Sequence, residues 1–568
     1  MFFPSRLARS LALAALLPFA PVAQAQQESG IAPGLAGAFL TGRVAVGSDD
    51  FARMAESYDR ALQIDPENAF FREMAMQGWL LSGEFEPAAR LAAQTVAAGE
   101  ASQVATLILQ ADAFLRGVYA EVIGALEDGL RTGPLTDAMA VAWANLGQGS
   151  MSDALDAMEL AITERPEIAP FALYQQALAL ALVGDMERAA DILSGDAEQP
   201  VSLSRRGVLA HIAILSQLDQ FEAAIALADA VFGSPPDDDV AQIVALLQDR
   251  QTVPFTTITT AREGMAEVYF TLSGALVGDQ SEWLPIIYGR LALALNPEHG
   301  DAILLTGQLL ERAGQYDLAD ETYLMMPKTS AQYLGAELGR ANALYQSGQT
   351  DEAIESLIAL SAARPDSVLV FSSLGDLLRR EERFAEAAEA YTSAIDLIDT
   401  LEPRHWVLLY TRAIALERIG DWERAEPEFR RVLEFVPDEP QVLNYLGYSL
   451  IEQRRNLDEA LDMIERAVEG DPDSGYITDS LGWAFYRLGR YEEAVPVMER
   501  AVELLPRDPI LNDHLGDVYW AVGRYREARF QWRRAISFAP HPDLDLDLVR
   551  RKLEVGKDAA LEEFEGAE

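Results

Sequence analysis

The chain has 568 residues, 49% of them apolar, so it can bury a large core and is not a disordered protein. Its 90 Asp and Glu residues face only 45 Lys and Arg, and this formal charge of −45 argues against binding nucleic acid or anionic lipid. The absence of cysteine excludes disulfides, thiolate metal sites, a cysteine nucleophile and a lipidated cysteine. The acidity either selects basic, neutral or apolar partners or only keeps a large surface soluble.

Residues 1–25 have the pattern of a secretory signal peptide. Arg6 and Arg9 form a basic start, an apolar stretch follows, and Ala23-Gln24-Ala25 is a small-residue cleavage site. The apolar stretch is shorter than the roughly 18–20 residues that a membrane anchor needs. We therefore expect cleavage after Ala25 and a periplasmic protein of net charge −45 − 2 = −47, beginning with a short polar leader at residues 26–34.

Residues 35–250 are predicted to form a degenerate array of helix pairs. Glycine, aromatic, alanine and proline recur in the same order, as in the run from Gly42 through Tyr58 to Pro66. The array ends in a helix over residues 237–250.

Residues 251–262 interrupt the rhythm. The run QTVPFTTITT is rich in β-branched residues and is predicted to be irregular. Thr260 and Glu263 have the spacing of a capping box, which predicts a fresh helix start. The stretch is either a linker or hinge between sub-domains, a binding loop, or a simple insertion between stacked repeats.

Residues 263–540 contain the clearest repeats. The prolines that close the last four units are separated by 472 − 437 = 35, 506 − 472 = 34 and 540 − 506 = 34 residues. Each of the last three units opens with a Leu-Gly pair, at Leu446-Gly447, Leu481-Gly482 and Leu515-Gly516. A period of about 34 residues with these residue types indicates repeated helix–turn–helix units.

The middle copy shows why the unit is helical. Leu481 and Phe485 fall on one helical face, and Gly489 suits a helix end. Gly482 lets the two helices of the pair approach closely, and Pro506 ends the second one. A single pair cannot bury its apolar face alone, whereas stacked neighbours can.

Residues 541–568 are predicted to be a capping helix followed by an acidic tail. Asp543, Asp545, Asp547 and Glu554 match part of a calcium-loop spacing, but the position that requires glycine is leucine. Acidic residues at the start of a helix explain the same pattern.

These motifs resemble the tetratricopeptide repeat family, closely over residues 440–540 and loosely before residue 240. The resemblance implies an all-α, right-handed α-solenoid of about thirteen helix–turn–helix units with a C-terminal capping helix. The sequence segments LNYLGYSL, DSLGWAFYRLGRYEEA and NDHLGDVYWAVGRYREARFQWRRA are similar to those of proteobacterial envelope repeat proteins. Among them is an outer-membrane lipoprotein that acts as adaptor for a C-terminal processing protease and delivers peptidoglycan cross-link hydrolases to it.

In the first helix of each repeat, one face carries the buried apolar stripe. A second set of residues points away from that stripe, because residues two apart on a helix differ in direction by roughly 200°. In the family that side lines a concave groove where peptides lie. The acids would repel a C-terminal carboxylate, so the predicted ligand is a basic or apolar peptide. Packing against the next repeat is the alternative explanation. The predicted groove residues are Asn444, Tyr448, Asp479, Trp483, Tyr486, Asp513, Asp517 and Trp520.

No catalytic, metal or cofactor motif emerges from the sequence, and its five histidines are scattered. The leading hypothesis is a non-enzymatic periplasmic scaffold or adaptor that holds protein partners and delivers substrates to an envelope protease or cell-wall hydrolase system. The alternative is a structural scaffold of a polysaccharide-export or outer-membrane assembly machine. An enzyme would need a site that the sequence does not reveal.

Overall fold

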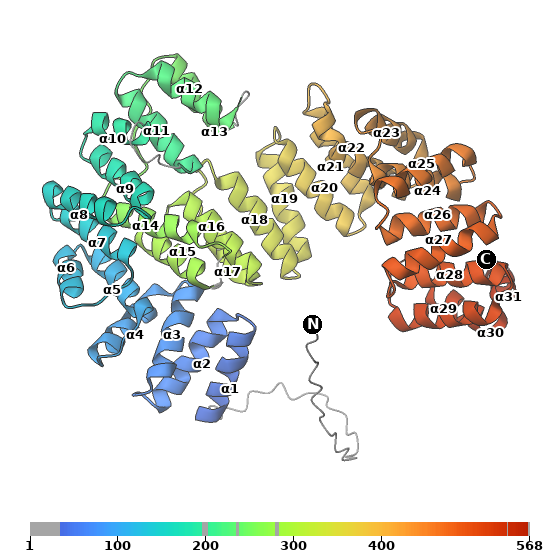
Figure 1. Ribbon diagram of the computed structural model, residues 1–568, viewed down its shortest axis with the longest axis horizontal. Coiled ribbons are helices and arrows are strands. Elements are labelled where there is room, and N and C mark those ends of the chain that lie inside the picture. Colours follow the sequence, from blue (N-terminus) through green and yellow to red (C-terminus); the bar gives the residue numbers. More distant parts are fainter. Residues whose placement is uncertain (1–33, 196–202, 234–237, 279–282, 542, 566–568) are drawn as a thin grey trace, which may run out of the picture. The chain divides into compact units, whose positions relative to one another are not determined.

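The computed structural model describes residues 34–195, 203–233, 238–278, 283–541 and 543–565 (Figure 1). Within these ranges every regular element is helical, which confirms the all-α prediction. The predicted signal peptide and nearly all of the leader lie outside the described residues. None of the described helices is long and apolar enough to cross a membrane.

The described residues pack as two compact units, and the division between them falls between Leu318 and Ala319. The segment 251–262 therefore lies inside the first unit rather than at the division between the two. The division falls within α17, a short helix that links the two repeat arrays in sequence.

The first unit starts with six helix pairs whose members succeed one another in the chain and pack together. They are α1 (Leu35–Gly47), α2 (Phe51–Ile64), α3 (Ala69–Ser82), α4 (Phe85–Ala97), α5 (Gln103–Arg116), α6 (Tyr119–Glu127), α7 (Pro134–Gly147), α8 (Met151–Glu164), α9 (Ala169–Leu182), α10 (Met186–Leu193), α11 (Arg205–Gln217) and α12 (Phe221–Phe232).

Small residues bring the helices of a pair together, as the sequence predicts. A methyl group added at Gly42 would lie 2.8 Å from the ring of Tyr58, which is fully buried. Asn68 caps α3, and Ser102 caps α5, by accepting from backbone N–H groups three residues on. The degenerate N-terminal half therefore keeps the repeat packing despite its weaker motif.

The second part of this unit follows the predicted irregular stretch. Thr260 accepts a hydrogen bond from the Glu263 backbone N–H, and α14 begins at Ala261, so the predicted helix start is confirmed. Its helices are α13 (Asp238–Gln248), α14 (Ala261–Ala275), α15 (Trp283–Leu295), α16 (Gly300–Arg312) and α17 (Tyr316–Tyr323).

Helices α14 and α15 do not simply continue the row of repeats. Besides each other, α14 contacts α5, α7 and α9, and α15 contacts α3 and α5. These partners are all first helices of N-terminal pairs. In Figure 1 the arc of α1–α12 curves around α14 and α15. The unit therefore fills its own inner face.

A buried charged cluster holds this arrangement. Glu267 of α14 is 1% exposed, and its carboxylate accepts from the Arg206 guanidinium at 2.8 Å and the Tyr174 hydroxyl at 3.0 Å. His299 Nδ1 accepts from the Ala302 N–H, which leaves Nε2 to donate to Glu267 at 3.0 Å. Burial would raise the pKa of Glu267, but Arg206 and His299 lower it to about 2. The sequence gives no sign of this cluster.

The second unit contains six more pairs and a cap. Its elements are α18 (Tyr333–Gln346), α19 (Thr350–Ala363), α20 (Val368–Arg380), α21 (Phe384–Asp396), the 3-10 turn η1 (Pro403–His405), α22 (Trp406–Arg418), α23 (Trp422–Phe435), α24 (Pro440–Glu452), α25 (Leu457–Gly470), α26 (Gly475–Arg487), α27 (Tyr491–Leu504), α28 (Pro509–Ala521), α29 (Tyr525–Phe538), α30 (Leu546–Val555) and α31 (Lys557–Glu565).

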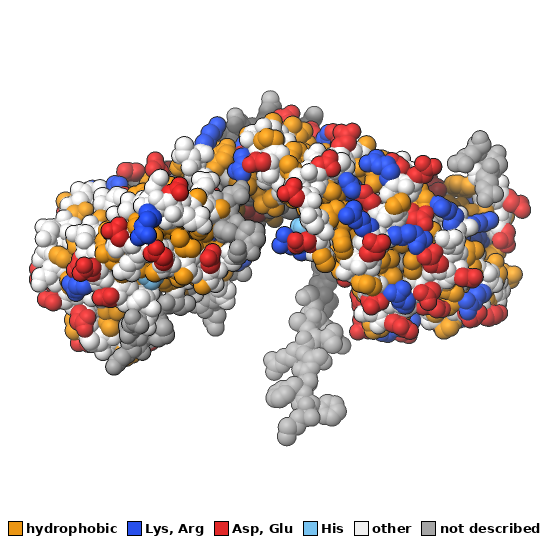
Figure 2. Space-filling model, turned by 90° about the horizontal axis from the view of Figure 1, so that it is seen from above, with side chains coloured by type: hydrophobic (Ala, Val, Ile, Leu, Met, Phe, Trp, Pro, Cys, Tyr) orange, Lys and Arg blue, Asp and Glu red, His pale blue; other side chains and the backbone are white. Residues whose placement is uncertain are grey.

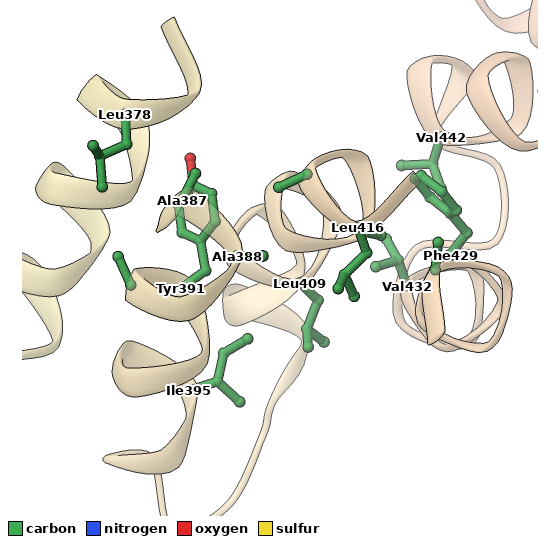
Figure 3. Close-up of a cluster of buried hydrophobic side chains, with 14 of the residues drawn as sticks. Leu378, Ala387, Ala388, Tyr391, Ile395, Leu409, Leu416, Phe429, Val432 and Val442 are labelled. Atoms are coloured by element: carbon green, nitrogen blue, oxygen red, sulfur yellow. The ribbon is translucent and has the colours of Figure 1, made fainter. Parts of the chain in front are cut away.

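Two adjoining apolar clusters run through consecutive pairs of this unit, one from α18 to α26 and one from α26 to α30, as expected for stacked repeats. Figure 3 shows side chains of α20 to α24 meeting in the first cluster, among them Tyr391, Leu416 and Phe429. A methyl group at Gly482 would lie 2.7 Å from Met498 Cγ, and Gly489 has a φ of +75° after α26 ends. Both predicted glycine roles are confirmed.

In the described residues, the six pairs of the first array, the α14–α15 pair and the six pairs of the second unit precede the cap, which agrees with the predicted number of about thirteen. The cap differs from the prediction. It consists of two helices, α30 and α31, separated by Gly556 at a φ of +91°. Most of the predicted acidic tail is therefore helical, because Gly556 turns the chain back into a further helix.

Candidate functional site: the inner pocket of the second unit

A cavity of about 730 Å³ opens on the first helices of the last repeats. Helices α22, α24, α26 and α28 supply one side, and residues before and at the start of α30 supply the other, namely His541, Asp543, Leu544, Asp545 and Leu548. We call it the inner pocket. It contains four of the predicted groove residues: Asn444, Tyr448, Asp479 and Asp513.

Carboxylates and tyrosines dominate the inner pocket. Besides Asp479 and Asp513, its acidic side chains are Glu417, Asp543 and Asp545, and its aromatic ones are Tyr445, Tyr448 and Tyr476. Among the described lining residues, Arg418 is the one Lys or Arg, and its guanidinium lies 4.9 Å from the ring centroid of Phe384. The site is therefore acidic and aromatic, as the sequence predicts for this face.

Two buried acceptor atoms at the pocket lack hydrogen-bond partners among the described residues. They are Oδ1 of Asp479 and Oδ1 of Asn444. Asp479 is only 5% exposed. An unpaired buried oxygen costs roughly 1–3 kcal/mol, and more when it is charged. These two atoms mark the place where a donor is missing.

The second oxygen of Asp479 is already engaged. It lies 2.8 Å from Nδ1 of His514, whose ring stacks on Trp483 with centroids 4.1 Å apart. Burial would lower the pKa of His514, but Asp479 and two further carboxylates raise it overall. Trp483 also donates to Glu452 at 2.8 Å, so it packs between neighbouring repeats while staying partly exposed.

The chain's own lysines occupy the other predicted acids. Lys552 Nζ of α30 lies 2.9 Å from Asp513 and 3.0 Å from Asp517. Lys557 Nζ of α31 lies 2.7 Å from Asp517. Burial would raise the pKa of Asp517, but the two ammonium groups lower it. Asp513 and Asp517 are both buried, so this structure shows them as the docking site of the cap.

The cap also covers the remaining predicted aromatics. Lys557 lies 4.3 Å from the ring centroid of Tyr486 and donates to its hydroxyl. Trp520 donates to Asp558 at 3.0 Å, and its ring sits against Gly556. The eight predicted residues thus separate into three groups. Asn444, Tyr448 and Asp479 line the inner pocket and do not bind the cap. The cap binds Tyr486, Asp513, Asp517 and Trp520, and Trp483 lies between these two groups.

The sequence analysis did not identify Tyr445, Tyr476 and His514 as pocket residues. It also did not identify Lys552 and Lys557 as the partners of Asp513 and Asp517. Lysine usage offered a signal, because only Lys328, Lys552 and Lys557 occur in the chain and two of them lie in its last segment. Asp545 caps α30 by accepting from the N–H groups of Asp547 and Leu548, as predicted. No group of three or more potential metal ligands occurs among the described residues.

Acidity elsewhere on the surface is different in kind. Figure 2 shows Asp and Glu side chains lying beside Arg side chains over much of the visible surface. A typical pair is Arg383 and Glu386, whose side chains are 38% and 52% exposed. Such exposed pairs contribute about 0–1 kcal/mol at most. The inner pocket differs because, of its five carboxylates, only Asp513 is paired with a lysine or arginine among the described residues.

Comparison with known proteins agrees with this architecture. The tetratricopeptide repeat family model matches residues 338–400, 410–475 and 453–509, all in the second unit. The fold and these matches define a helical-repeat scaffold of the kind suited to binding other proteins.

Several known repeat proteins are similar to this chain over part of its length. A TPR repeat-containing protein of Pseudomonas aeruginosa is 30% identical over 159 residues, which cover 28% of this chain and 26% of that protein. The chain thus spans about a quarter of the length of this curated relative. A tetratricopeptide repeat protein from Parabacteroides merdae is 14% identical, covering 45% of this chain and 98% of that one, with a TM-score of 0.38.

The Cut9–Hcn1 hetero-tetramer of the APC/C is 13% identical over 92% of this chain and 97% of that one, with a TM-score of 0.36. Both TM-scores are below 0.5, so the description of the fold rests on the helix pairs themselves.

Proposed function

We propose that this protein is a non-enzymatic periplasmic scaffold that binds protein partners through the inner face of its second unit. The observation that carries the proposal is the inner pocket, an open cavity of about 730 Å³ that contains predicted groove residues and two unpaired acceptor oxygens. The cap helices provide support by example, since they are a protein segment bound to the same row of first helices.

The periplasmic address rests on residues 1–25, with cleavage expected after Ala25. Cell fractionation with N-terminal sequencing of the purified protein tests it. A mature N-terminus at Gln26 in the periplasmic fraction supports the proposal. An intact Met1 on protein recovered from the cytoplasm would refute this part of it.

The partner class follows from the resemblance of the last repeats to envelope adaptors. We propose delivery of substrates to an envelope protease or cell-wall hydrolase system. Crosslinking pull-down from periplasm should compare wild type with Asn444→Ala/Tyr448→Ala, because these two side chains line the open pocket and neither binds the cap. Arg404→Ala, at an exposed turn outside the pocket, is the matched control.

Loss of a specific partner from the double variant, with retention by the control, supports binding through this face. Identical partners from all three proteins would contradict it. Recovery of a processing protease or wall hydrolase favours the adaptor role. Recovery of polysaccharide-export or outer-membrane assembly components favours the alternative, a structural scaffold of such a machine.

A further inference from the structure

Asp479 sets the chemistry of the inner pocket. Its Oδ1 is buried at the pocket wall without a partner, while Oδ2 is held by His514. A carboxylate oxygen accepts hydrogen bonds and does not donate them, so the missing group is a donor. Because this oxygen is shielded from water, and hydrogen bonds from cations to carboxylates are stronger than those from neutral donors, a cationic donor fits it best.

The surroundings favour a cation over a neutral donor. Asp543 and Glu417 line the same cavity, and the Glu417 carboxylate accepts from the Tyr445 hydroxyl at 3.1 Å. The Tyr448 ring also lines the pocket, and aromatic faces attract ammonium and guanidinium groups. Of the basic side chains near the pocket, Arg418 lies over Phe384 and Lys552 binds Asp513, so neither is a partner of Asp479 Oδ1.

The molecule itself shows which ligand this row of helices accepts. One turn along α28 from the pocket, Lys552 bridges Asp513 and Asp517 at 2.9 and 3.0 Å. Lys557 combines a carboxylate at 2.7 Å with the face of Tyr486. Carboxylates of α28 thus already bind two lysines of the cap, and in one case, Lys557, a tyrosine face contributes as well. The inner pocket has the same kinds of group, and of its carboxylates only Asp513 is paired with a lysine or arginine among the described residues.

We propose that the inner pocket receives a basic side chain, lysine or arginine, from an extended segment of a partner protein, with Asp479 Oδ1 as its main acceptor. This inference rests on the proposed function and specifies which segment of a partner binds. The acidity of the pocket then selects partners and rejects acidic ones.

Binding of defined peptides to the full mature chain tests the proposal. The probes are octapeptides of alternating glycine with lysine, glycine with arginine, and glycine with side-chain-acetylated lysine, titrated by calorimetry at about 0.15 M salt. We expect the two cationic peptides to bind and the acetylated one not to bind. Equal binding of the acetylated peptide would overturn the proposal.

Substitutions distinguish peptide binding in the inner pocket from nonspecific electrostatic attraction of a cationic peptide to an acidic protein. Asp479→Asn should weaken cationic peptide binding about tenfold or more, since it removes a buried charged acceptor. Asp462→Asn removes the same charge from a side chain that is 70% exposed on α25, and should change the affinity less than about twofold. Equal effects of the two substitutions would refute the pocket.

A third variant guards against a folding defect in Asp479→Asn. Tyr448→Leu keeps the apolar bulk and removes the aromatic face, and it should weaken lysine-peptide binding about threefold or more. Unchanged affinity in Tyr448→Leu and Asp479→Asn together would exclude the pocket. If partners are still captured by Asp479→Asn protein, the scaffold function stands and only this inference fails.

Discussion

The two units are built from the same helical repeat but differ in what covers the inner face of the repeat array. In the first, α14 and α15 lie against the first helices of the N-terminal pairs, and the Glu267 cluster fixes them there. In the second, the corresponding face carries an open acidic pocket, with the cap docked beside it. The same architecture can thus bury its inner face with its own helices or present it to a partner.

Charge placement explains the difference. The first unit balances its buried Glu267 with Arg206, His299 and Tyr174, leaving its carboxylate fully engaged. The second unit balances Asp513 and Asp517 with lysines but leaves Asp479 half engaged. A buried cluster whose hydrogen-bonding groups all have partners stabilises the fold, whereas a buried oxygen without a partner can accept a hydrogen bond from a ligand.

The largest expected effect is on the stability of the first unit, whose inner face is covered by α14 and α15. Glu267→Ala leaves the buried His299 without its carboxylate and leaves the half-buried Arg206 with Asp301 as its remaining carboxylate, so the first unit should lose roughly 3–5 kcal/mol of stability. Urea unfolding should show one transition moved and the other unchanged. Since Arg206 and His299 lower the pKa of Glu267 to about 2, its contribution is present above about pH 4.3 and lost toward pH 2. A change below about 1 kcal/mol would show that the cluster does not hold α14.

The cap provides the next test. Lys552→Met leaves Asp513 and Asp517 facing each other in a buried site, and α30–α31 should lose about 3 kcal/mol of docking free energy. Hydrogen exchange should rise in residues 546–565 alone. Lys328→Met, at an exposed position, is the control.

The same docking should depend on pH. Burial would lower the pKa of Lys552, but Asp517 and Asp513 raise it, and the two lysines lower the pKa of Asp517. The lysine contribution is thus lost as pH rises above about 10.4, and the Asp517 contribution as pH falls below about 3.9. Exchange that stays equally slow beyond both limits would contradict this ion pairing.

A smaller effect concerns the contact between α14 and α7. A methyl group at Gly264 would lie 2.5 Å from the Trp143 ring, so Gly264→Ala should destabilise the first unit by about 1–3 kcal/mol. Gly274→Ala on the same helix meets only Leu305 at 3.8 Å and should be neutral or stabilising by up to about 1 kcal/mol. Equal melting temperatures for the two variants would mean that α14 does not pack against α7.

The smallest effect belongs to His514 at the edge of the open pocket. Its pKa is raised, so its stabilisation is fully present below the unfolded value of about 6.5 and lost as pH rises through the folded value. His514→Gln should therefore lower the melting temperature more at pH near 5.5 than at pH near 8.5, by less than about 1 kcal/mol in free energy. An equal loss at both values would show that His514 is neutral throughout.

Much of this architecture was predictable because repeat packing is local. The prolines at 34-residue spacing, Gly482 against Met498 and Gly489 at a helix end each depend on neighbours within one unit. The same logic found Asn444, Tyr448 and Asp479 on one face. The sequence did not reveal that α31 follows α30, since Gly556 can end a helix or turn the chain into another.

By itself, then, the sequence determined the helical repeat, its period and the acidic, aromatic character of one face, because these depend on residues a few turns apart. Only the tertiary structure decided which faces are filled. Glu267 meets Tyr174 93 residues away in the chain, and Lys552 meets Asp513 39 residues away. No periodic pattern encodes such pairs, since they form only when folding brings distant helices together.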